Sequence, residues 1–367
     1  KLVELLALEQ EKSSQNLSLS VKTHSLKSKL IPLVTLAFSK RNLPKLLLML
    51  TTLTLISNFI FWGFTPTSTT LAEGKTDQIT FKTINCESTT SCDMQLTVRD
   101  MNGKIQLQKT YGGTSYDKAS AVLPITDGGY FLLGSTSSFG AGNYDMLLIR
   151  TDEKGTVIWQ KTYGGSDDDR GREIIQTQDG GYAIVGTSAS DDFDLTENNG
   201  SQDFWIAKLD ALGNISWQKS FGFQGDDMGL AVIQTSDSGY LITGVLDVTS
   251  SNGQGNTTRN TTRHAGGDYW AVKLDNSGNM QWTKYFGGNF TDTPEGVIET
   301  DNGDFIIAGS SDSIETDISG NKGTYDFWVI RIDSNGILVW EKSYGGTQTE
   351  EARAIVKSAD GNIVIAG

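Results

Sequence analysis

Histidine, cysteine and proline are scarce in this sequence of 367 residues. The 2 His, at positions 24 and 264, and the 2 Cys argue against a zinc site or a histidine-based catalytic triad, because both need such side chains in sets. The 5 Pro exclude a collagen or a proline-rich stalk. A glycine-rich phosphate loop between a strand and a helix is also missing, so the frequent Gly-Gly pairs indicate turns.

Positive charge is scarce beyond residue 72. The chain has 30 Lys and Arg against 44 Asp and Glu, a formal net charge of −14. The first 72 residues hold 8 of these basic and 3 of these acidic residues, so the remainder has a net charge of −19. Because such a surface repels the phosphates of nucleic acids, we expect no nucleic acid partner.

Residues 1–72 are predicted to be a leader. A basic stretch over 40–45 precedes an uncharged, mostly apolar run over 46–64, and small residues follow at positions 70 and 72. A cleaved signal peptide and a retained signal anchor both remain open, because a run of 19 residues just suffices to cross a bilayer. In both cases we expect an extracellular, cell-surface or periplasmic protein. Membrane contact is expected only through this segment, if it is not cleaved.

The next segment, residues 73–92, is predicted to be a linker that contains both cysteines. Cys86 and Cys92 are close in the sequence, and such a pair in an exported chain usually closes a small disulfide loop. A metal site would need more soft ligands than these two. We therefore expect a Cys86–Cys92 disulfide.

An internal repeat dominates residues 93–367. An aromatic residue followed by glycine recurs at Tyr111, Tyr163, Phe221, Phe286 and Tyr344, and an acid stands six residues after each. Seven of the 8 Trp fall at two positions of this repeat, which makes them structural packing residues. They are Trp159, Trp205, Trp217, Trp270, Trp282, Trp328 and Trp340.

Each repeat predicts four short strands. Turn signals such as Asp-Gly-Gly at 179–181 and Asp-x-x-Gly at 210–213 separate the strands, and a loop of variable length joins the second to the third. No stretch has a helical pattern, so the class is all-β. Four antiparallel strands in a unit of this length are typical of a β-propeller blade, whose faces are covered by the neighbouring blades.

The repeat predicts four complete units between two half-units. The first half-unit begins with a third strand at Asp93, and the last ends after a second strand at Gly367. Two alternatives remain open. The halves join to close a five-bladed ring, or the sequence is a fragment of a larger propeller.

The consensus Asp-x-Trp…Lys-Leu-Asp-x-x-Gly-x-x-x-Trp-x-Lys-x-Tyr-Gly-Gly…Asp-Gly-Gly-Tyr-x-x-x-Gly resembles the propeller repeats of secreted proteins from Bacteroidetes-type bacteria. The resemblance spans residues 93–367 and implies an exported propeller, which in that family is often one domain of several. The part formed by Asp210, Gly213 and Trp217 also looks like the tryptophan-docking motif of quinoprotein dehydrogenases. On its own this is a packing motif and implies no quinone.

Two loops carry oxygen-bearing side chains at every second position, each set followed by a glycine. Such a pattern suits a hard cation, so calcium is the one ion that we predict, and no other cofactor is expected. The alternative is a solvated acidic loop. The residues are Asp192, Asp194, Thr196 and Asn198 in the first loop, and Glu315, Asp317, Ser319 and Asn321 in the second.

We therefore expect an exported, non-catalytic binding, adhesion or scaffold module, as a monomer or as part of a longer multidomain chain. The repeated acids, such as Asp117 and Asp169, are expected to be hydrogen-bonding devices because every unit has one. A glycan or protein ligand would contact the variable loops at 135–144, 187–202, 245–267 and 310–325. The alternative is an extracellular enzyme, either a carbohydrate-active hydrolase or lyase or a quinoprotein-like oxidoreductase, since the fold alone does not choose.

Overall fold

The computed structural model describes β-strands joined by turns and loops. It describes the backbone of residues 3–5 and 68–71, and in full residues 78–84, 86, 91–126, 128–195, 198–255, 264–358 and 360–367. All regular elements in these ranges are strands, which confirms the predicted all-β class. Within them, no helix is long and apolar enough to span a membrane. The predicted apolar run of the leader, residues 46–64, lies outside the described residues.

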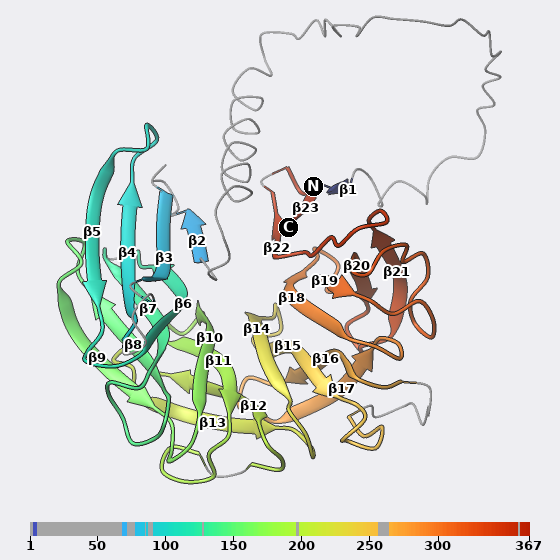
Figure 1. Cartoon of the computed structure of the whole chain (residues 1–367), viewed down its shortest axis with the longest axis horizontal. Coiled ribbons are helices and arrows are strands. Elements are labelled where there is room, and N and C mark those ends of the chain that lie inside the picture. The colour runs from blue at the N-terminus through green and yellow to red at the C-terminus, as the bar shows by residue number, and fades with distance from the viewer. Residues whose placement is uncertain are drawn as a thin grey trace, which may run out of the picture. The chain divides into compact units, whose positions relative to one another are not determined.

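Five four-stranded sheets form the body of the fold, each built from consecutive antiparallel strands (Figure 1). We number them along the chain. Sheet 1 contains β2 (Ser68–Leu71), β3 (Gln78–Ile84), β4 (Asp93–Arg99) and β5 (Ile105–Tyr111). Sheet 2 contains β6 (Asp117–Pro124), β7 (Tyr130–Thr136), β8 (Asp145–Thr151) and β9 (Val157–Tyr163).

The other three sheets repeat this order. Sheet 3 contains β10 (Asp169–Gln176), β11 (Tyr182–Ser188), β12 (Asp203–Leu209) and β13 (Ile215–Phe221). Sheet 4 contains β14 (Met228–Gln234), β15 (Tyr240–Asp247), β16 (Gly267–Leu274) and β17 (Met280–Phe286). Sheet 5 contains β18 (Asp292–Glu299), β19 (Phe305–Ser311), β20 (Asp326–Ile332) and β21 (Leu338–Tyr344).

Sheet 1 corrects the prediction for the start of the folded region. We expected a half-unit that begins at Asp93 and a linker over 73–92, but β2 and β3 precede β4 and complete the sheet. β3 pairs with β4 from Gln78 opposite Arg99 to Ile84 opposite Asp93. The segment was missed because it lacks the Asp-x-Gly turn and the terminal glycine that mark the second strands of sheets 2 to 5.

A partial unit follows sheet 5. β22 (Ala354–Lys357) and β23 (Ile363–Ala366) pair with each other, and β1 (Val3–Leu5) joins them next to β23. β22 packs on β18 and β19, as a first strand packs on the preceding sheet elsewhere. The two expected half-units therefore do not share one sheet, because sheet 1 already has its own first and second strands.

Apolar clusters join each sheet to the next. Between sheets 2 and 3, for example, Phe131 and Leu133 pack with Ile184 and Trp205. Equivalent clusters join sheets 3 and 4, 4 and 5, and 1 and 2. Contacts between first strands run from β6 to β10, β14, β18 and β22 in turn, while the fourth strands lie at the outer edge (Figure 1). Four-stranded meanders stacked in this way are the blades of a β-propeller.

The repeat tryptophans lie between the sheets. The indoles of the third strands, Trp205, Trp270 and Trp328, are at most 2% exposed. The half-buried indoles of the fourth strands each cover a turn glycine of the following sheet, where a Cβ would come within 2.9 Å of the ring. These pairs are Trp159 with Gly213, Trp217 with Gly278 and Trp282 with Gly336, while Trp340 is also half-buried. Glycine is needed in these turns because a larger residue would push the indole away.

Candidate functional site

The two ends of the sheets carry different connections. The tight turns after the first and third strands lie at one end, which we call the turn end. The loops after the second strands and the linkers between sheets lie at the other, the loop end. The described loops at this end are 137–144, 189–195 with 198–202, 248–255 with 264–266, and 312–325. They coincide with the loops predicted to contact a ligand.

Linkers and loops are hydrogen-bonded to one another at the loop end. The backbone N–H of Asp167, in the linker from sheet 2 to sheet 3, donates to Ser190 Oγ at 2.9 Å. The same contact joins Phe290 to Ser313 at 3.1 Å and Ser115 to Ser138 at 2.9 Å. The loop end is therefore a braced surface rather than a set of independent loops.

In sheets 2 to 5, the acid at the start of the first strand is held by several donors. Asp169 accepts hydrogen bonds from the backbone N–H of Gly165 at 2.7 Å, from the hydroxyl of Ser190 at 2.8 Å and from the hydroxyl of Ser188. The equivalent Asp117 has equivalent partners in sheet 2. These acids are hydrogen-bonding devices at the start of a sheet, which is the role that their presence in every unit predicted.

A second acid, at the start of each third strand, meets the first acid across a linker glycine. A Cβ on Gly287 would lie 2.5 Å from Asp268 Oδ1 and 2.5 Å from Asp292 Oδ2. Both aspartates are 0% exposed. Only glycine leaves room for both carboxyl groups here. The equivalent pairs are Asp93 with Asp117, Asp145 with Asp169, Asp203 with Asp227, and Asp326 with Glu350.

Burial raises the pKa of the paired acids of sheets 3 and 4, among others. It raises the pKa of Asp227 to about 6, and the charges of Asp203 and Asp247 act in the same direction. Burial raises the pKa of Asp292 to about 8, with a contribution from Asp268. The pKa of Asp203 is also raised by burial. The sequence showed the acids but not their pairing, because the partners come from different sheets.

The residues predicted to bind calcium lie in two equivalent loops, after β11 and after β19. Asp192 Oδ1 accepts the N–H of Ser166 at 2.8 Å, and Glu315 Oε1 accepts the N–H of Asn289 at 3.2 Å. The second acid of each loop also contacts the linker, because its backbone N–H donates to a linker carbonyl oxygen. These contacts run from Asp194 to Gly164 at 3.4 Å and from Asp317 to Gly287 at 3.2 Å.

The other members of the calcium pattern brace their own loops. Asn198 Oδ1 accepts the N–H of Gly200 at 3.0 Å, and Asn321 Nδ2 donates to two carbonyl oxygens of its loop at 3.0 Å. Ser319 donates to Glu341, and Thr196 lies outside the described residues. No three His, Cys, Asp or Glu side chains in the described ranges are arranged to hold a metal ion. Calcium binding stays a prediction.

His264 replaces a backbone donor in the longest loop. Its buried Nδ1 lies 2.6 Å from Asp268 Oδ2, and its Nε2 lies 3.8 Å from Asp317 Oδ2. In sheets 3 and 5 the equivalent oxygens accept backbone N–H groups at 2.8 Å, Asp203 from Asn199 and Asp326 from Lys322. No role for His264 follows from the sequence, in which the unusual length of its loop is the only signal.

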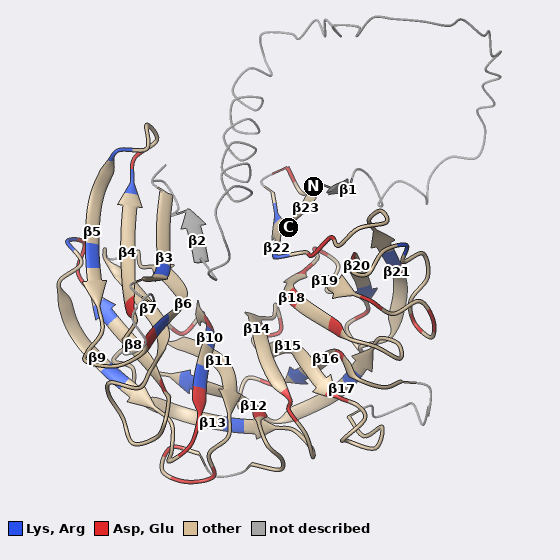
Figure 2. Cartoon of the chain, in the orientation of Figure 1, with Lys and Arg blue, Asp and Glu red and all other residues tan. Residues whose placement is uncertain are grey.

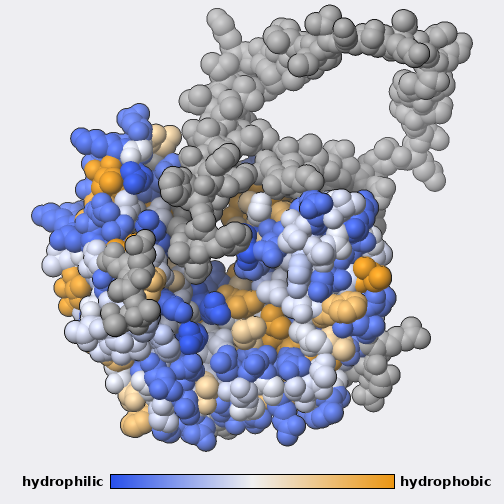
Figure 3. Space-filling view, viewed as in Figure 1, coloured by the Kyte–Doolittle hydropathy of each residue, from blue (hydrophilic) through white to orange (hydrophobic). Residues whose placement is uncertain are grey.

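Exposed apolar side chains also stand at the loop end, where acidic residues gather in the loops after β11 and β19 (Figure 2). Phe193 is 74% exposed, Ile314 65% and Phe290 54%. The visible surface is mostly hydrophilic, with separate apolar patches (Figure 3). Phe193 has a φ of 53°, a rare conformation for an aromatic residue, and Asp192 and Asp194 on either side are bonded to the linker. Phe193 was not predicted as a site residue because the exposure of a side chain cannot be seen in a sequence.

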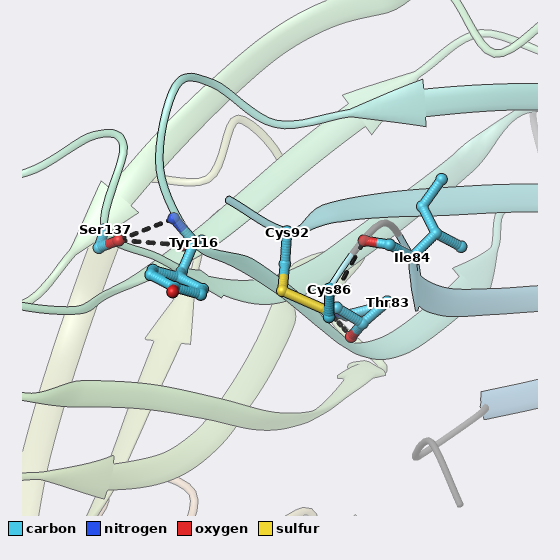
Figure 4. The surroundings of a disulfide bond; sticks show 7 residues. Thr83, Ile84, Cys86, Cys92, Tyr116 and Ser137 are labelled. Carbon is cyan, nitrogen blue, oxygen red and sulfur yellow. Dashed lines mark hydrogen bonds between the residues drawn. A yellow bond between two sulfur atoms is a disulfide. The ribbon is translucent and has the colours of Figure 1, made fainter. Parts of the chain in front are cut away.

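The disulfide lies at the loop end of sheet 1. Cys86 and Cys92 are joined, with their Cα atoms 4.7 Å apart, and close the connection between β3 and β4 (Figure 4). The other sheets have a variable loop in this position. The N–H of Cys92 donates to the carbonyl of Ser115, in the linker that follows sheet 1, at 3.2 Å, and its carbonyl accepts the N–H of Asp117, the first residue of β6, at 2.8 Å. The disulfide therefore fixes a contact between two sheets.

Comparisons with known proteins find similarity in structure only. No family model and no curated protein matches the sequence. The exo-β-1,3-galactanase of Clostridium thermocellum shares 12% identity over 75% of this chain, with a TM-score of 0.40, and this chain spans 64% of its length. A DUF4221-family protein of Bacteroides vulgatus shares 8% identity over 82% of this chain and 90% of its own, with a TM-score of 0.39. An endo-1,4-β-xylanase of Bacteroides thetaiotaomicron shares 11% identity over 82% of this chain and 94% of its own, with a TM-score of 0.36.

Proposed function

We propose that the protein is an exported, non-catalytic binding or adhesion module of the secreted Bacteroidetes-type propeller group, and that its loop end binds a glycan. The observation that carries this proposal is the presentation of Phe193. Its ring is exposed and is held between two acids of a braced loop. A rigid aromatic ring offers a face to the C–H groups of a sugar, and neighbouring carboxylates accept its hydroxyl groups.

Rigidity supports a binding role. The loop of Phe193 is bonded to the linker through Asp192 and through Ser190, so little conformational entropy is lost when a ligand binds. Phe290 and Ile314 offer a similar exposed apolar position two junctions further on, between sheets 4 and 5, where the N–H of Phe290 donates to the hydroxyl of Ser313. Two such positions on one end suit a repeating polymer such as a polysaccharide.

The use of the repeated acids also supports binding over catalysis. Asp117 and Asp169 each accept hydrogen bonds from one backbone N–H and two hydroxyl groups of the protein. A carboxylate that acts as general acid or nucleophile on a glycoside must reach the scissile bond instead. These aspartates are 0% exposed, so a substrate would have to displace the linker to reach them.

Export is proposed together with this function. The Cys86–Cys92 disulfide supports it, because disulfides persist in oxidising compartments outside the cytoplasm. Fractionation of the native host tests it. Recovery of the protein outside the cell or on its surface supports export, and recovery in the cytoplasm contradicts it.

A glycan array with wild-type protein tests binding, and Phe193→Ala is the decisive variant. We expect a signal that falls at least about tenfold in Phe193→Ala, since an aromatic anchor contributes more than 1.4 kcal/mol. Ile158→Ala is the matched control, because Ile158 is 58% exposed but lies on an outer strand. Equal losses in both variants would contradict the proposed site. A signal on a protein array only would replace the glycan by a protein ligand.

Turnover is measured in the same samples to test the enzyme alternative. Release of a soluble product from a bound polysaccharide, abolished by one Asp→Ala change, would contradict the non-catalytic role. Binding without product release supports it.

A further inference from the structure

Basic side chains gather at the inner edge of sheets 2 and 3. β6 and β10, the first strands of these sheets, each have a strand of their own sheet on one side only, and they contact each other. Lys118 is the second residue of β6, and Arg170 holds the same position in β10. Arg172 lies two residues further along β10, where basic residues are blue in Figure 2. The three cations therefore lie next to the loop end, where these strands begin.

A tyrosine ring brings two of these cations close together. Lys118 Nζ lies 5.9 Å and Arg170 Cζ 4.3 Å from the centre of the Tyr144 ring. The two charges are thus at most about 10 Å apart, close enough for both to attract one anion. Arg170 is also bonded to Asp168 at 3.0 Å, and the backbones of Asp168 and Tyr144 pair with each other. Contacts between two sheets therefore fix this group.

A β-bulge presents the third cation. In sheets 2 to 5 the pairing of the first strand with the second skips one residue of the first strand, always at the same position. In β10 the skipped residue is Arg172, between Gly171 and Glu173. A bulge redirects the side chain of its extra residue, and the Arg172 side chain is exposed at the inner edge. It forms no hydrogen bond or ion pair with the described residues, so its charge is available to a ligand.

Sheets 4 and 5 do not repeat this set of cations. The residues at the two corresponding positions are Met228 and Leu230 in β14, and Thr293 and Glu295 in β18. The charge of Glu295 also acts on Arg172, but Glu295 is itself bonded to Arg353 at 3.1 Å. Among the described residues, Asp168 is the one acid in an ion pair with the three cations. This junction therefore stays positive in a chain whose formal net charge is −14.

These features suit an anionic group on the ligand. The N–H groups of a guanidinium form paired hydrogen bonds with two oxygens of a carboxylate, and they bind other oxyanions such as sulfate through the same donors. We propose that the glycan bound at the loop end is acidic, and that its carboxylate or sulfate groups bind Arg172 and Lys118. This inference rests on the proposed glycan-binding function and names the class of glycan. Phe193 belongs to the loop after β11, at the same end of sheet 3.

Uronic acid polymers and their methyl esters test the proposal, because esterification removes the charge and keeps the sugar chain. The probes are polygalacturonate, alginate and hyaluronan. A sulfated galactan and its desulfated form separate sulfate from carboxylate. We expect wild-type protein to bind at least one charged polymer about tenfold more tightly than its uncharged form. Because the attraction is between charges near the surface, about 0.5 M NaCl should remove most of this preference.

Arg172→Gln is the decisive variant, because it removes a charge that has no ion pair within the described structure. We expect it to lose most of the tenfold preference, and the double variant with Lys118→Gln to bind charged and uncharged polymers equally. Lys154→Gln is the matched control, since Lys154 is exposed in a turn at the other end of sheet 2. It should keep the full preference. Urea midpoints equal to that of wild type show that the variants fold.

Three results would overturn the proposal. Equal binding of charged and uncharged polymers by wild type, with a loss in Phe193→Ala, would leave the proposed glycan site intact and make the acidic class wrong. A preference that survives in the double variant, or that Lys154→Gln reduces as much as Arg172→Gln does, would show that other charges select the ligand. Absence of binding to every glycan, charged or neutral, would contradict the proposed function as well.

Discussion

The two ends of the sheets use aspartate in opposite ways. At the turn end Asp210 is only half-buried and accepts two backbone N–H groups of its own turn, which lowers its pKa. At the loop end Asp169 is buried, and burial raises its pKa although three donors surround it. Aspartate therefore stabilises a single turn at the solvent-accessible turn end, whereas at the buried loop end it joins two sheets. Position in the repeat, not residue type, decides the role.

The glycines of the two ends provide the sharpest test of this contrast. Gly287→Ala at the loop end places a Cβ 2.5 Å from two carboxyl oxygens, so the acids must move apart. We expect a loss of about 3 kcal/mol in the free energy of unfolding, measured with urea. Gly180→Ala at the turn end has open space around the Cβ but a φ of 80°, so a loss of about 1 kcal/mol is expected. Equal losses would erase the difference between the ends.

The sequence predicted the sheets better than it predicted what lies between them. Strand positions followed from turn signals such as Asp210-x-x-Gly213, which act within a few residues. β3 was missed because its turn is atypical. The pairing of Asp203 with Asp227 and the burial of His264 were missed because they depend on contacts between sheets, which no local pattern encodes.

The calcium pattern illustrates the same point. Asp192 and Glu315 fit a ligand spacing in the sequence, but in the structure they bond the N–H groups of Ser166 and Asn289 in the preceding linker. An alternation of oxygen-bearing residues along a loop indicates only that their side chains lie on the same side of the loop. Whether that side holds an ion or a neighbouring chain segment depends on the fold.

The indoles of the fourth strands test the packing between sheets. Trp217→Ala removes the ring over Gly278 and its edge contact with Tyr240, whose ring centroid is 5.5 Å away. We expect a loss of about 2 kcal/mol in the free energy of unfolding. Trp217→Leu copies the natural Leu107 of sheet 1 and should lose about half of this. An unchanged free energy of unfolding in Trp217→Ala would show that this indole does not stabilise the packing between sheets.

A single hydroxyl group tests one polar contact between sheets. Tyr163 Oη donates to the carbonyl of Gly213 at 2.7 Å, from sheet 2 to sheet 3. Tyr163→Phe should cost about 1 kcal/mol, because the buried carbonyl loses its donor. The equivalent Phe221 and Phe286 show that the ring alone is compatible with the fold. Loss of folding in this variant would show that the contact is more than a local hydrogen bond.

Calcium is expected to have the smallest effect. If the predicted loops bind it, millimolar calcium raises Tm by a few degrees, a chelator reverses the rise, and Asp194→Ala and Asp317→Ala remove it. No rise in wild type would leave the hydrogen bonds of Asp192 and Glu315 as the explanation of the pattern.

The most direct measurement compares the same substitution at the two ends. Asp169→Ala leaves the N–H of Gly165 and the hydroxyl groups of Ser188 and Ser190 without their acceptor inside the protein. We expect this variant to lose about 3 kcal/mol in the free energy of unfolding. Asp210→Ala leaves the N–H groups of Leu212 and Asn214 free to bond water. The urea midpoint of this variant should therefore stay close to that of wild type. Similar losses in both variants, or a larger loss in Asp210→Ala, would contradict the account.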